Sequence, residues 1–157
     1  MDDWRQSQEV LVMDGRIKLP YSWSAGEVGT SYLESLRDNQ KFLGTRCPEC
    51  GIVYHIPRMH CPDCFTECER YVELASVGEL VTFTVARRPH PRLAPLEGLF
   101  GYGIIKLDGA DTGFLHLLAE FEEGELETGA RVEAVFAEER DGSVLDVRYF
   151  RPVKGVA

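Results

Sequence analysis

Hydrophobic and polar residues alternate one by one through much of the second half of the chain, a pattern typical of β-strands that bury one face. From position 81 onward, for example, valine and phenylalanine alternate with threonine. Alternation predicts strands over residues 81–86, 131–136 and 145–149, and two further β-like runs predict strands over residues 99–107 and 114–119. Five strands in roughly eighty residues, with no helical pattern between them, predict a closed or partly open β-barrel, for which the OB-fold is the natural size match.

A different spacing precedes the strands and predicts a helix. Hydrophobic residues recur every fourth position from Val28 to Leu36, so a helix that ends near Asn39 would have one apolar face. Either Ser24 or Thr30 suits the N-cap position, where a side-chain oxygen accepts a hydrogen bond from a free backbone N–H. Because an isolated helix of this length is marginal in water, we expect the segment that follows to cover its apolar face.

Between the helix and the strands, four cysteines form two Cys-x-x-Cys pairs, Cys47 with Cys50 and Cys61 with Cys64. Each pair places two sulfurs on one side of a tight turn, and two facing turns put four thiolates at the corners of a tetrahedron. Zn²⁺ prefers this arrangement in structural sites, so we expect these four residues to bind zinc. Because four protein ligands leave no open coordination position, the metal should stabilise the fold and take no part in chemistry.

Other interpretations of the cysteines remain open on sequence alone. The four thiols could form two disulfides or be unrelated buried groups, and His60 could replace Cys61 or Cys64 as a ligand. Iron in the same site would make an electron carrier, although the gap between the pairs is usually wider in such iron sites. We interpret the fifth cysteine, Cys68, as a bystander, because the sequence shows no reliable partner that would activate its thiol.

The formal net charge of −9 is unfavourable for a nucleic-acid binder, whose affinity comes largely from neutralising phosphates. The charge is unevenly spread. Residues 120–141 hold nine acidic and two basic residues, whereas residues 41–92 hold seven basic and six acidic residues and three of the four histidines. We therefore expect an anionic ligand to meet the middle of the chain. We interpret the acidic run 122–127 as a solvated turn, with an electrostatic face for a basic partner as the alternative.

Basic residues gather in the proline-rich loop that joins the first two predicted barrel strands: Arg87, Arg88, His90 and Arg92. The planar fork of arginine matches phosphate oxygens through two parallel hydrogen bonds, so this loop is a candidate for contact with a phosphate-bearing ligand or with a partner. The alternative is a solvated basic loop. His116 lies in an apolar segment, and we interpret it as a core or interface residue rather than a catalytic base.

No stretch of the chain approaches the roughly 18 apolar residues of a membrane span, and the first residues lack the pattern of a signal peptide. We therefore expect no membrane association and a cytoplasmic location, where thiols stay reduced and paired cysteines more often bind metal. The sequence contains no paired carboxylates, nucleophile elbow or phosphate-binding glycine loop that would support catalysis by this chain alone.

The order of these motifs carries a resemblance to a known family. A short helix is followed by Cys-Pro-x-Cys-Gly, by the tripeptide Ile56-Pro57-Arg58 and by a second Cys-Pro-x-Cys, and then by the barrel segments. This order resembles the bacterial and archaeal family in which a rubredoxin-like zinc ribbon is fused to an OB-fold. The resemblance runs from about Leu19 to Pro152.

The patterns and the resemblance together predict a mainly β protein with an N-terminal helix, a rubredoxin-like zinc ribbon and a five-stranded OB-fold β-barrel. The expected divisions are a lead-in and helix, the zinc ribbon, the barrel and a short tail, over residues 1–40, 41–70, 71–152 and 153–157.

The resemblance also implies a function. Members of this family are accessory subunits of thiolase-fold enzymes and related acyl-CoA enzymes, and some help to form the CoA-binding site. The chain is therefore expected to be a non-catalytic subunit that positions a CoA thioester, in an even-numbered hetero-oligomer with a thiolase-type enzyme. Arg58 is expected to contact an anion, although the family often has Pro-Pro-Arg where this chain has Ile56-Pro57-Arg58.

The alternative function is a single-stranded nucleic-acid-binding module. OB-folds commonly bind single strands by stacking bases on aromatic side chains in a positive groove. The rings available in the predicted strands are those of Phe83, Phe100, Tyr102 and Tyr149. The acidic balance of the chain argues against this reading.

Overall fold

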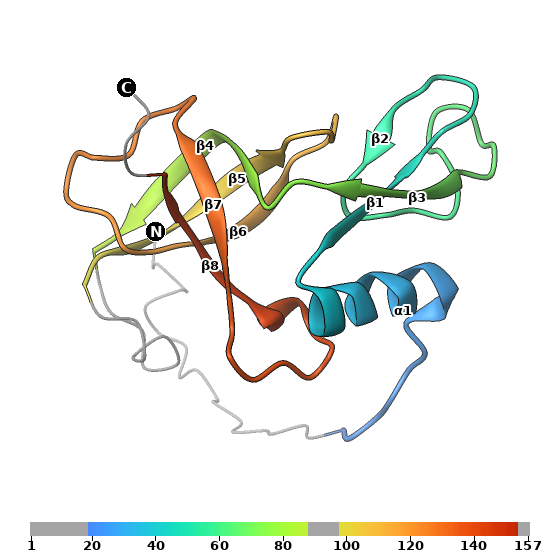
Figure 1. The fold of residues 1–157 in the computed structure, drawn as a ribbon, viewed down its shortest axis with the longest axis horizontal. Helices are drawn as coiled ribbons and strands as arrows, with labels where there is room; N and C mark the ends of the chain where they lie inside the picture. Colours follow the sequence, from blue (N-terminus) through green and yellow to red (C-terminus); the bar gives the residue numbers. More distant parts are fainter. Residues whose placement is uncertain (1–18, 88–97, 154–157) are drawn as a thin grey trace, which may run out of the picture.

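The computed structural model describes residues 19–87 and 98–153 of the 157-residue chain. A helix comes first, a small three-stranded sheet follows, and a five-stranded barrel completes the described chain (Figure 1). No helix in these two ranges is long and apolar enough to cross a bilayer.

The helical segment consists of α1 (Gly26–Glu34) and a π-helical turn, η1 (Ser35–Asn39). It ends at Asn39, as predicted, where Gln40 adopts the left-handed conformation that closes many helices. The predicted cap at Ser24 forms differently, because its hydroxyl accepts from the Gly26 N–H, 3.1 Å away, and α1 has no side-chain cap.

The ribbon sheet has three antiparallel strands in the order β2-β1-β3, namely β1 (Phe42–Arg46), β2 (Val53–Tyr54) and β3 (Glu69–Leu74). The first two strands flank the first cysteine pair. The strand pattern did not predict β3, which pairs with β1 across the whole cysteine-rich segment, so its formation depends on contacts distant in sequence.

The barrel is closed, with strand order β4-β5-β6-β8-β7, which is the OB-fold order. All five predicted strands are present, as β4 (Val77–Ala86), β5 (Phe100–Leu107), β6 (Phe114–Leu118), β7 (Arg131–Phe136) and β8 (Val147–Pro152). Closure comes from the parallel pairing of β6 with β8, while the other pairs are antiparallel. The last strand begins later than expected, because Val144–Asp146 forms a 3-10 turn, η3.

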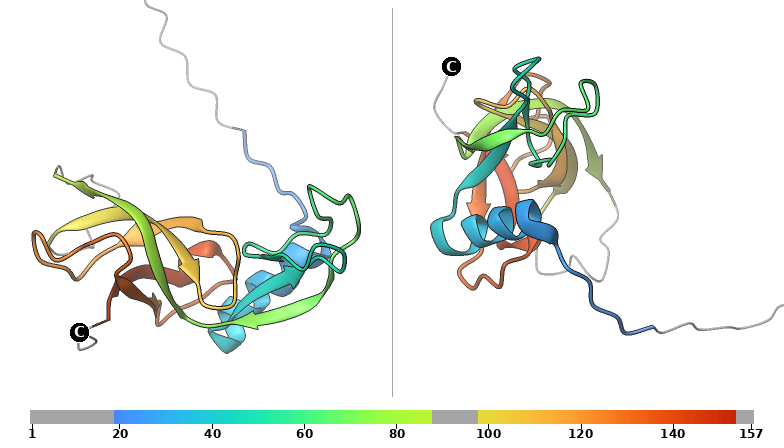
Figure 2. Two further views of the ribbon diagram at one scale, coloured as in Figure 1. Left: turned by 90° about the horizontal axis from the view of Figure 1, so that it is seen from above. Right: turned by 90° about the vertical axis from the view of Figure 1, so that its right-hand side faces the viewer.

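A single hydrophobic core runs through all three parts of the molecule. It contains Tyr32 and Leu36 from the helical segment, Phe42 from the ribbon, and Leu118 and Phe150 from the barrel. The apolar face of the helix is therefore covered by the ribbon, as expected, and also by the barrel. Figure 2 shows the ribbon at one end of the molecule and the barrel at the other, with the helix alongside the ribbon.

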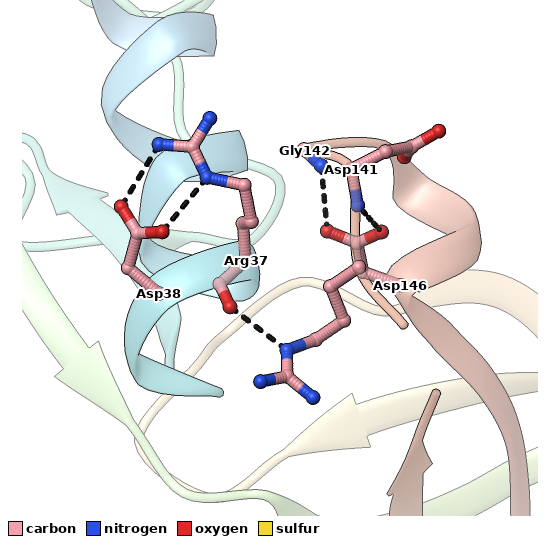
Figure 3. Close-up of polar contacts among 6 residues, drawn as sticks. Arg37, Asp38, Asp141, Gly142 and Asp146 are labelled. Atoms are coloured by element: carbon pink, nitrogen blue, oxygen red, sulfur yellow. Dashed lines mark hydrogen bonds and ion pairs between the residues drawn. The ribbon is translucent and has the colours of Figure 1, made fainter. Parts of the chain in front are cut away.

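Polar contacts fasten the loop between β7 and β8 to the end of the helix. The Arg140 side chain donates to the main-chain carbonyl of Arg37, 2.8 Å away. The buried Asp146 carboxylate accepts hydrogen bonds from the N–H groups of Asp141 and Gly142, each 3.0 Å away (Figure 3). Because these contacts order the loop, they also position η3 beside the helix.

Candidate metal centre and ligand pocket

The ribbon brings the two cysteine pairs together through two similar turns. In the first, the Gly51 N–H donates to the Cys47 carbonyl at 3.0 Å, and in the second the Phe65 N–H donates to the Cys61 carbonyl at 3.0 Å. Both donating residues have positive φ, 76° for Gly51 and 57° for Phe65. Glycine adopts this conformation without strain, so the first turn follows from its sequence, whereas the second places a phenylalanine there.

The sulfur atoms of Cys47, Cys50, Cys61 and Cys64 all lie within 4.8 Å of one another. Zinc–sulfur bonds of about 2.3 Å in a tetrahedron separate the sulfurs by roughly 3.8 Å. The Sγ atoms of Cys50 and Cys61 are 3.8 Å apart, which fits that geometry and is far from the length of a disulfide bond. All four residues are free cysteines. The donor set and its spacing therefore suit a tetrahedral thiolate metal site.

The histidine alternative for this site has no support in the described residues. His60 forms an isolated β-bridge with Glu67 and is absent from the group of side chains that could hold a metal ion. That group consists of the four cysteines, within the part of the chain that the structure describes.

Tyr54 packs beside the cysteine cluster and supports it. Its hydroxyl lies 3.2 Å from Cys61 Sγ, and both residues are buried. Hydrogen bonding from the Tyr54 hydroxyl lowers the pKa of the Cys61 thiol, because it stabilises the thiolate. The Cys64 N–H also donates to Cys61 Sγ, at 3.4 Å. Since the thiolate is the form that binds metal, these contacts prepare Cys61 as a ligand.

Cys68 lies near this cluster and is half-buried. Its burial raises the pKa of its thiol, the reverse of what a reactive nucleophile requires. The Cys68 N–H donates to the Met59 carbonyl at 2.8 Å, so the residue helps to close the second turn. This environment agrees with the interpretation of Cys68 as a bystander.

Of the predicted anion-contacting residues, the structure describes Arg58 and Arg87, and these two lie in different parts of the molecule. Arg58 is exposed on the ribbon, with its guanidinium carbon 5.6 Å from the centre of the Tyr54 ring. Arg87 follows β4, whose end lies on the side of the barrel away from α1 (Figure 1), and it forms an exposed ion pair with Glu123 at 2.9 Å. Arg88, His90 and Arg92 lie outside the described residues.

A cavity of about 400 Å³ opens where the helix, the ribbon and the barrel meet, and the sequence analysis did not find it. Tyr32 and Phe42, both buried, line its inner part. The exposed side chains of its rim include Ile56 of the ribbon and Leu115 of the barrel. The complete lining is Tyr32, Phe42, Ile56, Tyr102, Phe114, Leu115, His116, Leu117, Val144, Leu145, Val147 and Arg148.

Two imidazoles lie at or beside this cavity, and burial lowers the pKa of both. His55 is 3% exposed, and burial lowers its pKa to about 4. Its Nε2 lies 3.1 Å from the Tyr32 hydroxyl, and the Phe114 ring packs against it with 4.4 Å between ring centres. Burial also lowers the pKa of His116, which lines the cavity and whose buried Nδ1 has no hydrogen-bond partner among the described residues.

The aromatic residues that a nucleic-acid-binding barrel would use are mostly inaccessible. Phe100 and Tyr149 are buried, and Phe83 is half-buried and packs against the core. Tyr102 is 38% exposed. Buried rings cannot stack on bases, so the described residues do not form an aromatic platform of the kind that single strands require.

Comparison with known proteins agrees with the architecture. A family model described as the rubredoxin-like zinc ribbon domain of ChsH2 matches residues 35–67, and one described as the C-terminal OB-fold domain of ChsH2 matches residues 71–137. Together they match more than half of the chain. The chain belongs to the ChsH2 family. The predicted resemblance to a family with a zinc ribbon and an OB-fold is thereby confirmed, as is the predicted fold class.

Two solved structures share this fold. One, described as "Ltp2-ChsH2(DUF35) aldolase", is 22% identical with a TM-score of 0.56, over 78% of this chain and 93% of that one. The other is a protein of unknown function from the DUF35 family of Sulfolobus solfataricus. It is 23% identical with a TM-score of 0.55, over 70% of this chain and 78% of that one.

Proposed function

We propose that the chain is a non-catalytic subunit of an acyl-CoA enzyme complex, and that its partner is a thiolase-type enzyme that cleaves or forms a carbon–carbon bond. Support comes from family membership, because one solved protein of similar fold carries the ChsH2 name in the description of an aldolase. The chain would bind or position the CoA thioester and stabilise the partner, while the partner supplies the nucleophile and the bases. Such positioning alone can contribute much of a rate enhancement.

The observation that carries this proposal is an exposed apolar surface at the cavity opening, which we call the mouth surface. It consists of Ile56, Tyr102, Leu115, Val144 and Leu145, whose exposed fractions range from 38% for Tyr102 to 77% for Leu145. Large apolar side chains gathered in this way mark sites of interaction. Because the mouth surface includes residues of both the ribbon and the barrel, a partner bound there would contact both.

Zinc is the metal we propose for the four-cysteine centre. The sulfur spacing fits it, and all four coordination positions are filled by protein thiolates, namely those of Cys47, Cys50, Cys61 and Cys64. A metal held in this way has no position for substrate, so it would stabilise the ribbon that carries Ile56 and Arg58.

Basic side chains near the mouth surface suit the phosphates of CoA. Arg148 lines the cavity, and Arg58 follows the mouth-surface residue Ile56 by two positions. Arginine binds phosphate oxygens through its planar fork. We include both in the proposal, together with the loop residues Arg87, Arg88, His90 and Arg92, which would contact either CoA or the partner.

The test is native mass spectrometry of this chain, affinity-purified at its natural level from the source cells. We expect an even-numbered hetero-oligomer, since symmetric enzymes are most often dimers or tetramers. Peptide sequencing should identify the partner as a thiolase-type enzyme. Recovery of the chain alone, or with RNA or single-stranded DNA, would contradict the proposal.

A matched pair of variants locates the interface. Leu145→Asp places a charge on the mouth surface and should remove the partner from the purified complex. Val81→Asp, on β4 and outside the cavity lining, is the control and should leave the complex intact. Equal loss of partner in both variants would assign the interface elsewhere.

A further inference from the structure

The segment that precedes α1 carries a cluster of exposed apolar side chains. Leu19, Tyr21 and Trp23 are 74%, 76% and 74% exposed. Among the described residues, five large apolar side chains are more than 70% exposed, and three of the five belong to this short segment. Single exposed apolar side chains are common on proteins, whereas a cluster of them marks an interaction site. We call residues 19–23 the arm.

The arm presents its apolar side chains in a single row. Proline or serine stands between them, so an extended chain places Leu19, Tyr21 and Trp23 on one face. The Tyr21 and Trp23 rings are neighbours, with 5.3 Å between their centres. Figure 2 shows the arm running away from α1 in both views. Extended peptides with a side chain at every second position are recognised by surfaces that offer a pocket for each.

The junction between the arm and the helix is restrained. The Ser24 hydroxyl accepts a hydrogen bond from the Gly26 N–H, 3.1 Å away. Gly26 has a φ of 72°, which glycine adopts without strain, and Pro20 has a fixed φ within the arm. Such restraints reduce the conformational entropy that the arm would lose on binding, so they favour affinity.

Charge and composition indicate what kind of surface the arm meets. Residues 19–26 include no charged residue, although the net charge of the chain is −9. A second copy of the chain would be repelled by this charge, and so would an anionic membrane surface, which attracts basic segments. Tyrosine and tryptophan are among the residues that most often dominate the binding energy between proteins. These observations favour a different protein as the occupant.

The arm lies close enough to the mouth surface for one partner to cover both. Tyr32, which lines the cavity, is about 9 Å along the helix axis from Gly26. The chain from Trp23 to Gly26 spans at most about 11 Å, so Trp23 lies within roughly 20 Å of Tyr32. One side of a standard interface covers about 800 Å², a patch roughly 30 Å across.

We propose that the arm docks in an extended apolar groove of the partner enzyme, where Tyr21 and Trp23 contribute most of its binding energy. The identity of the partner as a thiolase-type enzyme rests on the proposed function, whereas the docking role follows from the exposure, alternation and lack of charge of the arm. The arm gives the partner a second contact beyond the mouth surface. Two linked contacts bind more tightly than either alone, because the second forms within an existing complex.

The experiment titrates the partner, separated from the purified complex, with the full-length, zinc-loaded chain. The test variant combines Tyr21→Ser with Trp23→Ser, and Ser22→Ala, on the opposite face of the arm, is the matched control. We expect the Kd to rise about 100-fold in the double variant and to change less than about threefold in the control. Circular dichroism checks that both variants are folded. A folded double variant that binds as tightly as the parent would overturn the proposal.

Trp23 also reports directly on its own surroundings. The chain has two tryptophans, so Trp4→Phe leaves Trp23 as the single position for a fluorotryptophan label. Its fluorine NMR signal should move when the unlabelled partner is added, and a signal that stays in place would contradict the proposal. A signal that moves with the concentration of the chain alone would instead assign the arm to a second copy. One that moves with vesicles of phosphatidylcholine and phosphatidylserine would assign it to a membrane.

The outcomes separate this inference from the proposed function. A thiolase-type partner that binds the parent and the double variant equally would keep the proposed function and reject the docking role of the arm. A partner of another class that binds the parent and not the double variant would reject the proposed function and keep the arm as a docking segment. Recovery of the chain without any protein partner would reject both.

Discussion

The tip of the ribbon and the barrel differ in what holds them together. At the tip, the buried cluster consists of Cys47, Tyr54 and Cys61, with a few half-buried neighbours, and two of the three are proposed metal ligands. The barrel instead contributes most of a large apolar core and closes its hydrogen bonds into a ring. Stability of the tip should therefore depend on a metal, and stability of the barrel on apolar burial.

The base of the ribbon, like the barrel, is held together by apolar burial. Phe42, Val53 and Leu74 come from its three strands but lie in the main core with the helix and the barrel. The boundary between the part expected to depend on metal and the part stabilised by apolar burial therefore lies inside the ribbon, between its tip and its sheet. The comparison teaches that one small domain can have a metal-dependent half and a half that its neighbours stabilise.

The largest effect should come from removing a metal ligand. Cys61→Ser should release zinc and unfold the ribbon tip, because structural zinc contributes roughly 10–16 kcal/mol in zinc-finger peptides near pH 7. Metal analysis and hydrogen exchange would measure the two losses, with protection retained in the barrel. Cys68→Ser is the matched control and should keep its zinc. A stable, zinc-loaded Cys61→Ser protein would contradict the four-cysteine assignment.

The next effect should be confined to the apolar core. Phe150 is completely buried in the barrel, so Phe150→Ala should lower the free energy of unfolding by about 3–5 kcal/mol. Urea titration would measure this, and the zinc content of the folded protein should remain unchanged. Val81→Ala, at a position 40% exposed, should cost far less. Loss of zinc together with the barrel would show that the two regions unfold as one unit.

A smaller effect should come from pH through His55, which lies where the helix, ribbon and barrel meet. Its pKa falls from 6.5 to about 4 on burial, so below pH 6.5 the unfolded chain binds a proton that the folded chain does not. Stability should therefore fall as pH drops from about 6.5 toward 4, by about 2 kcal/mol between pH 7 and pH 5.

Zinc ligands also take up protons in acid, so the measurement compares the parent with His55→Phe. Urea titrations at each pH give both free energies of unfolding, and their difference isolates the imidazole. We expect the variant to lose about 2 kcal/mol less than the parent between pH 7 and pH 5. Parallel pH profiles would show that His55 does not titrate with folding.

The smallest effect should come from the hydroxyl beside the metal centre. Tyr54→Phe keeps the ring that packs under Arg58 but removes the hydrogen bond to Cys61 Sγ. Groups that support metal ligands in this way typically change affinity by roughly 10–100-fold, and we expect the lower end because the Cys64 N–H remains. Competition with a chelator would measure the metal affinity of the parent and of the variant. Unchanged affinity would limit Tyr54 to packing.

Features that depend on neighbouring residues could be predicted from the sequence. The end of the helical segment at Asn39, the five barrel strands and the clustering of the four cysteines all follow from local spacing. The predicted strands were less accurate where contacts between residues far apart in the sequence, or hydrogen bonds from a loop, determine the structure. Strand β3 forms only because β1 is available to pair with it, and Val144–Asp146 turns because Asp146 accepts from the loop before it.

The candidate ligand site could not be predicted in the same way. Its lining comes from the helix, the ribbon and three barrel segments, and no spacing in the chain marks residues so far apart as neighbours. The same limit applied to the arginines, since a charge count could not show that Arg58 and Arg87 lie in different parts of the molecule. Nor could it show that an exposed ion pair joins Arg87 to Glu123.

By itself, the sequence determined the barrel strands and the clustering of the four cysteines, because periodicity and Cys-x-x-Cys spacing act over a few residues. Only the tertiary structure decided where the helix packs, that partial or full burial lowers the pKa of His116 and His55, and that a cavity opens between the domains. These depend on strand order and on which apolar faces meet. The physical reason is that burial and cavities belong to surfaces brought together by folding, and no single segment contains them.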